Sequence, residues 1–216
     1  RESVFENFEA NLRRYPILLP RLMDEPLESL AHLRLHNGTI WRWNRPLIGF
    51  DDDGTPHLRI EHRTMSSAPS IVDNIANIAF YYGLVQYYAT CIDPPEALLS
   101  FADTKDNFYR SAQIGPGYRA AWIDGDRHSI RDLILDRLLA EAETGLAHLG
   151  VSDKDSKFYL GIIESRIKSE QTGTQWQRRF AELHDHDMQL LTRSYYHNQQ
   201  HNKPVHEWDF ESYTSC

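Results

Sequence analysis

The chain contains little cysteine. Only two occur in 216 residues, Cys91 within an apolar stretch and Cys216 at the last position. Two such thiols exclude a disulfide framework and a zinc site built from cysteines. A chain of this kind is typical of a reducing compartment, so we predict a cytoplasmic protein.

The chain also lacks a surplus of positive charge. Asp and Glu together number 31 against 23 Lys and Arg, which gives a formal net charge of -8. A surface that binds nucleic acid needs clustered cations to displace counterions, and no basic block is present. The composition therefore argues against a nucleic-acid partner.

Long uninterrupted apolar runs are absent as well. The longest apolar stretch, within residues 71–89, is interrupted by Asp73, Asn74, Asn77 and Gln86. It therefore predicts a buried helix, and we expect no membrane partner. With 41% hydrophobic and 25% charged residues, the chain has the composition of a globular protein with a real core.

The common glycine-based nucleotide motifs are missing. The chain has no P-loop, no dinucleotide-binding fingerprint and no nucleophile elbow, and Gly115-Pro116-Gly117 indicates only a turn. If the protein handles ATP, we expect it to do so through carboxylates, arginines and cations carried on a sheet.

Helical periodicity and capping signals predict most of the secondary structure. Ser3 with Glu6 resembles a capping box, Ser70 with Asp73 resembles a capping pair, and His36-Asn37-Gly38 is typical of a helix end. We predict helices over residues 3–14, 25–35, 70–91, 103–113, 129–148, 153–169 and 174–200.

Strand signals occur in the first third of the chain. Residues 39–44 and 57–64 favour strands, and the acidic segment 51–56 between them is a dense turn, so an antiparallel pair is expected. The predicted fold class is α+β: the strand pair and a long buried helix within residues 36–92, followed by a mostly helical region over residues 93–216. We interpret Asp51-Asp52-Asp53 as a surface turn in preference to a metal loop.

One face of the second predicted strand is charged. Arg59, Glu61 and Arg63 alternate with Leu58 and Ile60, so the charged side chains share a face. The pattern suits a solvated ladder of salt bridges. It also suits a polar cavity in which Glu61 offers oxygen to a hard cation and the arginines meet phosphate or carboxylate oxygens.

Four ordered motifs carry a family resemblance. They are Trp43-Asn44-Arg45-Pro46 followed by Leu58-Arg59-Ile60-Glu61-His62-Arg63, then 106–112 (Asp-Asn-Phe-Tyr-Arg-Ser-Ala), Trp122-Ile123-Asp124, and 172–178 (Thr-Gly-Thr-Gln-Trp-Gln-Arg). In this order they resemble the C-terminal part of the glutamate-cysteine ligase type 2 (carboxylate-amine ligase) family, over roughly residues 36–183.

The resemblance implies a glutamine-synthetase-like fold, with an antiparallel sheet that forms a polar funnel. It implies a ligase that uses ATP and magnesium to convert the glutamate side-chain carboxylate into an acyl phosphate, which an amine such as cysteine then attacks. On this resemblance Glu61 is a magnesium ligand, Arg63 a catalytic phosphate contact, and Arg45 and Arg59 contacts to substrate carboxylate or phosphate. Arg178 is a weaker candidate of the same kind.

The chain also departs from the family. Gln113 stands where the family has an arginine, and nothing before Thr39 resembles the family's first strand with paired metal-binding glutamates. The first residues show neither Met nor an apolar signal core, so we expect a fragment, a processed form or a portion of a longer polypeptide. We expect the N-terminal half of the catalytic domain to be absent and this chain alone to be inactive, because one carboxylate cannot hold several magnesium ions.

Two further alternatives remain open from sequence. A non-catalytic domain could keep the ligase fold and use the charged face to bind a ligand or a protein. The sequence also leaves open a homo-oligomer, since Trp208 and Phe210 near the C-terminus could dock on a neighbouring copy or fold back on their own domain.

Overall fold

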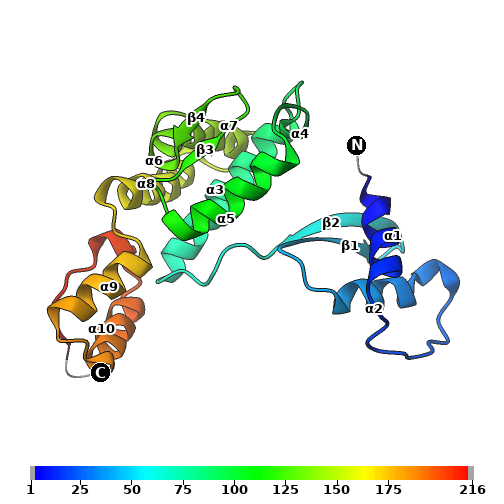
Figure 1. Cartoon of the computed structure of the whole chain (residues 1–216), viewed down its shortest axis with the longest axis horizontal. Coiled ribbons are helices and arrows are strands. Elements are labelled where there is room, and N and C mark those ends of the chain that lie inside the picture. The colour runs from blue at the N-terminus through cyan, green and yellow to red at the C-terminus, as the bar shows by residue number, and fades with distance from the viewer. Residues whose placement is uncertain (1–2, 214–216) are drawn as a thin grey trace. The chain divides into compact units, whose positions relative to one another are not determined.

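A computed structural model of the chain describes residues 3–213 and has the expected α+β class, mostly helical with small antiparallel sheets (Figure 1). It divides into two compact units, Arg1–Ser66 and Ser67–Cys216, called here the N-terminal and C-terminal units. The boundary separates the strand pair from the long helix. The sequence pattern had assigned both to one region, residues 36–92.

Two helices open the N-terminal unit. The helix α1 (Val4–Arg14) begins with the predicted capping box, in which Ser3 and Glu6 bind each other's backbone N–H groups. After a single 3₁₀ turn η1 (Leu27–Ser29), α2 (Ala31–Thr39) begins later and ends later than expected. Gly38 lies inside its last turn and supplies no left-handed residue, so the prediction of a helix end at 36–38 is wrong.

The predicted antiparallel pair is confirmed, but the bounds of its first strand are wrong. The strands are β1 (Asn44–Phe50) and β2 (Pro56–His62), and the register pairs Arg45 with Glu61 and Leu47 with Arg59. Residues 39–43 finish α2 and link it to β1, because the Arg45 side chain binds carbonyls at the end of α2 and draws that segment in. The acidic turn lies where predicted, with Gly54 at a φ of 85°.

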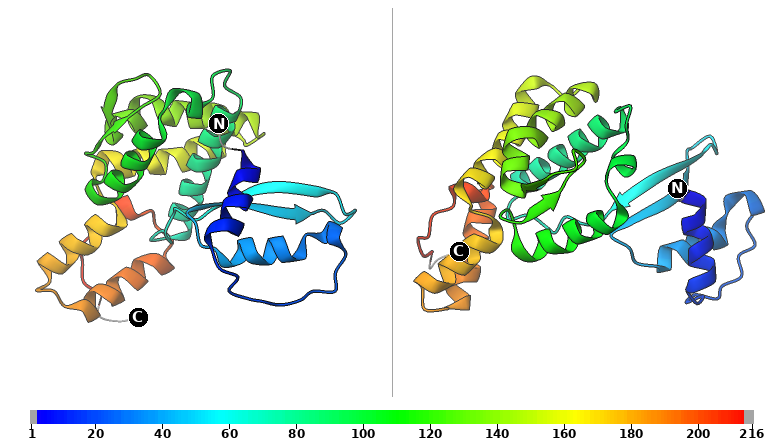
Figure 2. Two further views of the ribbon diagram at one scale, coloured as in Figure 1. Left: turned by 45° about the vertical axis from the view of Figure 1, so that its right-hand side comes forward. Right: turned by 45° about the horizontal axis from the view of Figure 1, so that its top comes forward.

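The C-terminal unit is built around α3 (Ile71–Ala89), which Ser70 caps as predicted. Two helices, α7 (Leu139–His148) and α8 (Asp153–Ser169), pack along α3 and form the core with it (Figures 1 and 2). The remaining elements before α7 are α4 (Pro95–Leu98), α5 (Phe101–Ile114), β3 (Arg119–Ala121), β4 (Arg127–Ser129), α6 (Ile130–Leu133) and the π-helical turn η2 (Ile134–Leu138).

Two glycines allow α3 and α7 to approach closely. A Cβ atom added to Gly145 would lie 1.8 Å from the carbonyl oxygen of Gly83, and one added to Gly83 would lie 2.4 Å from that of Ala142. No side chain fits at such distances, so both positions require glycine for the helix crossing.

The expected single helix over residues 174–200 is two helices, α9 (Gly173–Leu183) and α10 (Met188–Gln200). Asp185 and His186 adopt positive φ, and the Asp187 side chain caps α10, so this polar segment makes a turn that the apolar periodicity hid. Beyond α10 a 3₁₀ turn, η3 (Val205–Glu207), leads to Trp208, which packs with Trp176 and Phe180 in a buried aromatic cluster. The tail therefore folds back on its own unit.

Among the residues that the structure describes, no helix has both the length and the apolar character needed to cross a bilayer.

Candidate functional site

Three of the predicted site residues meet on one face of the β1–β2 hairpin. Arg45 donates from Nε to Glu61 Oε2 at 2.9 Å, and its Nη2 lies 2.7 Å from the same oxygen. Arg63, the residue that follows β2, lies with Nε 3.0 Å from Oε2 and Nη2 3.2 Å from Oε1. Glu61 therefore receives both guanidinium groups.

Burial and charge determine the protonation state of Glu61 in this cluster. The Arg45 side chain is 9% exposed, whereas those of Glu61 and Arg63 are each 32% exposed and reach solvent. Hydrogen bonds from Arg63, together with the charge and hydrogen bond of Arg45, hold the pKa of Glu61 below its usual value of 4.5. Glu61 is thus a carboxylate at neutral pH, with oxygens at the surface.

Arg45 also binds the end of α2. Its Nη1 donates to the carbonyl oxygen of Gly38 at 2.8 Å and lies 3.4 Å and 3.5 Å from those of Ile40 and Asn37. A cation is favourable at a helix C-terminus, where carbonyl groups lack partners. Arg45 therefore anchors Glu61 to the helix as well as to the hairpin.

A buried amide network supports this anchor, and no sequence pattern predicted it. Asn11 of α1 donates to Asn37 Oδ1 at 3.1 Å, and Asn37 donates to the Pro46 carbonyl at 2.8 Å. Arg42 donates to Asn11 Oδ1 at 2.6 Å. The two asparagines are almost fully buried, so they join α1, α2 and β1 beneath the charged face.

The other two predicted residues lie apart from the ion-paired cluster. Arg59 stands opposite Leu47 in the register, on the face of Glu61, and is exposed. Arg178 is exposed on α9 and belongs to the C-terminal unit. The structure thus groups Arg45, Glu61 and Arg63, adds Arg59 to the same face, and places Arg178 in the other unit.

An aromatic pair precedes β1. The rings of Trp41 and Trp43 lie 4.6 Å apart in an edge-to-face arrangement, and 58% and 40% of these residues is exposed. The Trp43 carbonyl accepts a hydrogen bond from the Arg63 backbone at 2.8 Å, which fixes this aromatic surface beside the charged face. Exposed indoles are able to stack on planar ligands.

Magnesium fits this face only in part. No group of three or more His, Cys, Asp or Glu side chains within residues 3–213 is arranged to hold a metal ion. Magnesium is commonly held by one or two carboxylates together with substrate phosphates and water, and Glu61 supplies one such carboxylate beside two cations suited to phosphate. Glu61 would have to exchange part of its contact with Arg63 for the metal.

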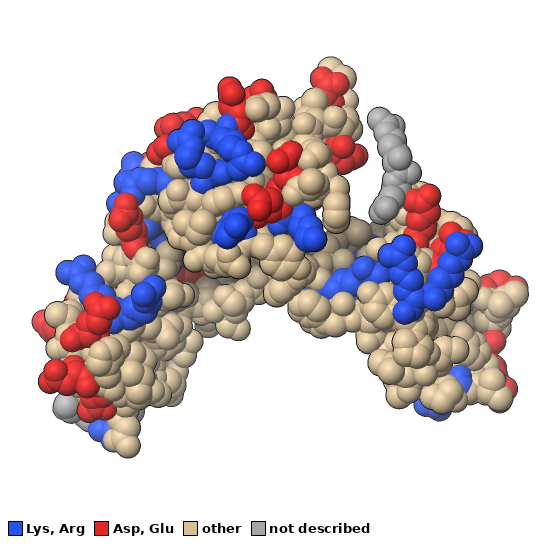
Figure 3. Space-filling view, viewed as in Figure 1, with Lys and Arg blue, Asp and Glu red and all other residues tan. Residues whose placement is uncertain are grey.

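A large apolar cavity occupies the same unit. Its volume is about 980 Å³, and α1, α2, both strands and the irregular segment 17–22 line it. Figure 3 shows charged side chains on the face of this unit drawn there, arginines beside acidic residues, with uncharged surface below them. The lining includes, among others, Phe5, Phe8, Leu12, Leu33, Ile48 and Leu58.

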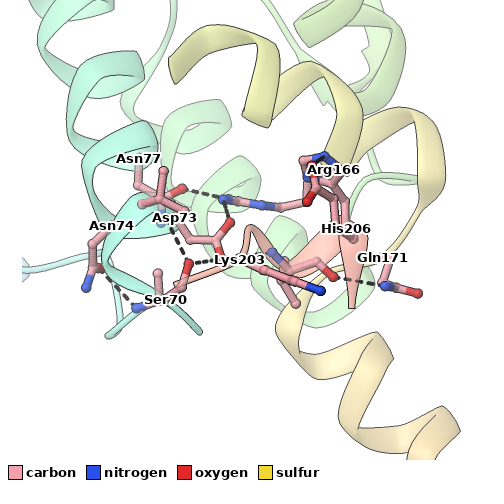
Figure 4. A network of polar contacts seen from close by, with 12 residues as sticks. Ser70, Asp73, Asn74, Asn77, Arg166, Gln171, Lys203 and His206 are labelled. Carbon is pink, nitrogen blue, oxygen red and sulfur yellow. Dashed lines mark hydrogen bonds and ion pairs between the residues drawn. The ribbon is translucent and has the colours of Figure 1, made fainter. Parts of the chain in front are cut away.

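The C-terminal unit has a polar centre of its own, shown in Figure 4. Asp73 is fully buried and accepts from Arg166 Nη2 at 2.6 Å, from the Ser70 hydroxyl at 2.7 Å and from the Val205 backbone at 3.0 Å. Arg166 also donates to Asn77 at 2.7 Å. The sequence identified Asp73 only as a capping residue, and it missed Arg166. Because every Asp73 contact is internal, this network joins α3, α8 and η3.

Comparisons of this chain with models of known families, with curated proteins and with solved structures found no match.

Proposed function

We propose that the chain forms part of an ATP- and magnesium-dependent ligase with a glutamine-synthetase-like fold, which joins the side-chain carboxylate of glutamate to an amine such as cysteine. The observation that supports this most is the position of Glu61 between Arg45 and Arg63, with Arg59 exposed on the same face. These residues also carry the strand motif of the carboxylate-amine ligase resemblance.

The reaction needs charge neutralisation more than covalent help from the protein. A carboxylate oxygen of glutamate attacks the γ-phosphorus of ATP, and the bond to the departing ADP oxygen breaks. The amine nitrogen then attacks the acyl carbon, phosphate leaves and the nitrogen loses a proton. Glu61 would be one of the ligands that hold magnesium, and the metal would supply positive charge to the phosphates.

The arginines divide into two roles in this proposal. Arg63 and Arg59 reach solvent and are able to contact phosphate oxygens. The nitrogens of Arg45 are already engaged with Glu61 and with the end of α2, so Arg45 positions Glu61. One carboxylate is one metal ligand, so the proposal requires further carboxylates from outside the described residues.

A second candidate function is favoured by the cavity. A domain without catalysis that binds an apolar ligand or a protein segment would use the space of about 980 Å³ in the N-terminal unit. The two candidates predict different ligands, because the cavity lining is apolar and the hairpin face is charged.

Calorimetric titration of the natural polypeptide that carries this sequence with ATP, with and without magnesium, tests the first candidate. We expect magnesium-dependent binding that Glu61→Gln weakens by about tenfold, because the metal loses a charged ligand. Glu28→Gln is the matched control, since Glu28 is exposed on η1 and distant in sequence from the hairpin. Circular dichroism checks that both variants are folded. ATP binding that does not respond to magnesium, or that is equal in wild type and Glu61→Gln, contradicts the proposal.

A further inference from the structure

Among the residues that the structure describes, none forms a strand along the outer edge of β2. The hairpin is a two-stranded sheet, so each strand is hydrogen-bonded on one side only. Leu58 and Ile60 are 60% and 58% exposed, whereas Arg45 and Gly49 on β1 are buried. An exposed edge of this kind is a template for pairing with another strand.

The alternation of backbone hydrogen bonds along β2 shows which residues direct their N–H and C=O groups outward. Arg63 N–H donates to the Trp43 carbonyl, and the Thr55 carbonyl accepts from Asp51, so odd-numbered residues at both ends of β2 turn their backbone groups toward β1. Backbone groups alternate along an antiparallel strand. Leu58 and Ile60 therefore direct their backbone N–H and C=O groups outward. Within residues 3–213, these groups form no hydrogen bond on that side.

The charges of β2 are complementary to a second copy of the same strand. In an antiparallel pair centred on Ile60, Arg59 of one copy lies opposite Glu61 of the other, twice by symmetry. Centring the pair on Arg59 opposes two arginines, and centring it on Glu61 opposes two glutamates. Opposite charges in facing positions stabilise a sheet and like charges destabilise it, so Ile60 is the favoured centre.

We propose that the free edge of β2 pairs with β2 of a second copy of this chain, with the two-fold axis at Ile60, to form a four-stranded sheet. The axis is perpendicular to the sheet, so both Glu61 side chains lie on one face. The partner's Arg59 then lies beside Glu61 and joins Arg63 on the charged face. The dimer is inferred from the geometry and charges of the strand. A role for the partner's Arg59 in phosphate binding rests on the proposed function.

Analytical ultracentrifugation of the full chain tests the assembly. The chain should sediment as a dimer at micromolar concentration, and Arg59→Glu should raise the dimer dissociation constant by roughly tenfold or more, because both symmetric attractions become repulsions. Arg14→Glu is the matched control, since it makes the same charge change at the exposed end of α1. A wild-type monomer at all concentrations, or equal effects of the two variants, overturns the proposal.

Cross-linking tests the register. In a background with Cys91→Ser and Cys216→Ser, Ile60→Cys should cross-link to itself with a short bis-maleimide, because the two positions face each other. Leu58→Cys points to the same face but lies four residues from its symmetry mate, about 13 Å along the strand, and should not cross-link. Cross-linking at residue 58 in place of residue 60 overturns the register. Because neither measurement uses ATP, a failed dimer and a failed ligase proposal are distinguishable.

Discussion

Glu61 and Asp73 each bind arginine, and their surroundings separate their roles. Glu61 keeps solvent access between Arg45 and Arg63, whereas Asp73 is fully buried and serves three internal donors. Sequence alternation was sufficient to place Glu61 and Arg63 on one face. It could not link Asp73 to Arg166, because 93 positions separate them and no local pattern connects a capping aspartate to a distant arginine.

Asp73→Asn should destabilise the chain. The substitution leaves the largely buried Arg166 without its charged partner, which we expect to cost about 3 kcal/mol in the free energy of unfolding. Urea denaturation measures the change. Asp103→Asn is the matched control, because Asp103 has the same capping contact with a serine, Ser100, but its side chain is 42% exposed and its arginine partner, Arg127, lies 3.8 Å away. Its loss should cost less than about 1 kcal/mol. Equal costs for the two substitutions would show that burial of the ion pair is unimportant.

At the scale of the element, local signals predicted most helix bounds to within two residues, and the exceptions are α2 and the break between α9 and α10. The caps at Ser3 and Ser70 were read correctly, since a cap depends on residues three positions apart. The end of α2 and the start of β1 were misplaced, because Arg45 decides both through contacts that form only in the folded unit. The break between α9 and α10 was missed because it depends on positive φ at non-glycine residues, Asp185 and His186.

The crossing of α3 and α7 gives a prediction at this scale. Gly145→Ala should lower the free energy of unfolding by roughly 2 kcal/mol, because its Cβ would overlap the Gly83 carbonyl and force the helices apart. Gly161→Ala is the control, since no atom lies within 4 Å of an added Cβ there, and it should stabilise α8 by up to about 1 kcal/mol. Thermal denaturation of both variants measures the contrast. A neutral Gly145→Ala would contradict the close crossing.

At the scale of the whole molecule, the sequence predicted the α+β class and the strand pair, while the division after Ser66 was not predicted. The segment 64–70 is short and carries no glycine-rich or charged linker. The boundary depends on which helices contact one another, and α3 finds its partners in α7 and α8, far along the chain.

Stability of the C-terminal unit should fall in mild acid. Burial lowers the pKa of His206 below its usual value of 6.5 and outweighs the opposing charges of Glu207 and Asp73, while the charge of Arg166 adds a smaller effect in the same direction as burial. The unfolded chain therefore binds the proton more readily, so the stability contribution is present above pH 6.5 and is lost as the pH falls below it.

Urea denaturation of wild type and His206→Gln between pH 7.5 and about 5 tests this linkage. The variant should lose part of the pH dependence, whereas His148→Gln, at the exposed end of α7, should retain it. A wild-type stability that rises as the pH falls would contradict the direction of the shift.

The central claim is that Glu61 serves a carboxylate-amine ligase. The most direct measurement is the rate of ADP formation by the natural polypeptide that carries this sequence, supplied with ATP, magnesium, glutamate and a panel of amines that includes cysteine. We predict amine-dependent ADP formation that Glu61→Gln lowers by about a hundredfold. No amine-dependent ADP, or the same rate in Glu61→Gln as in the wild type, would contradict the claim.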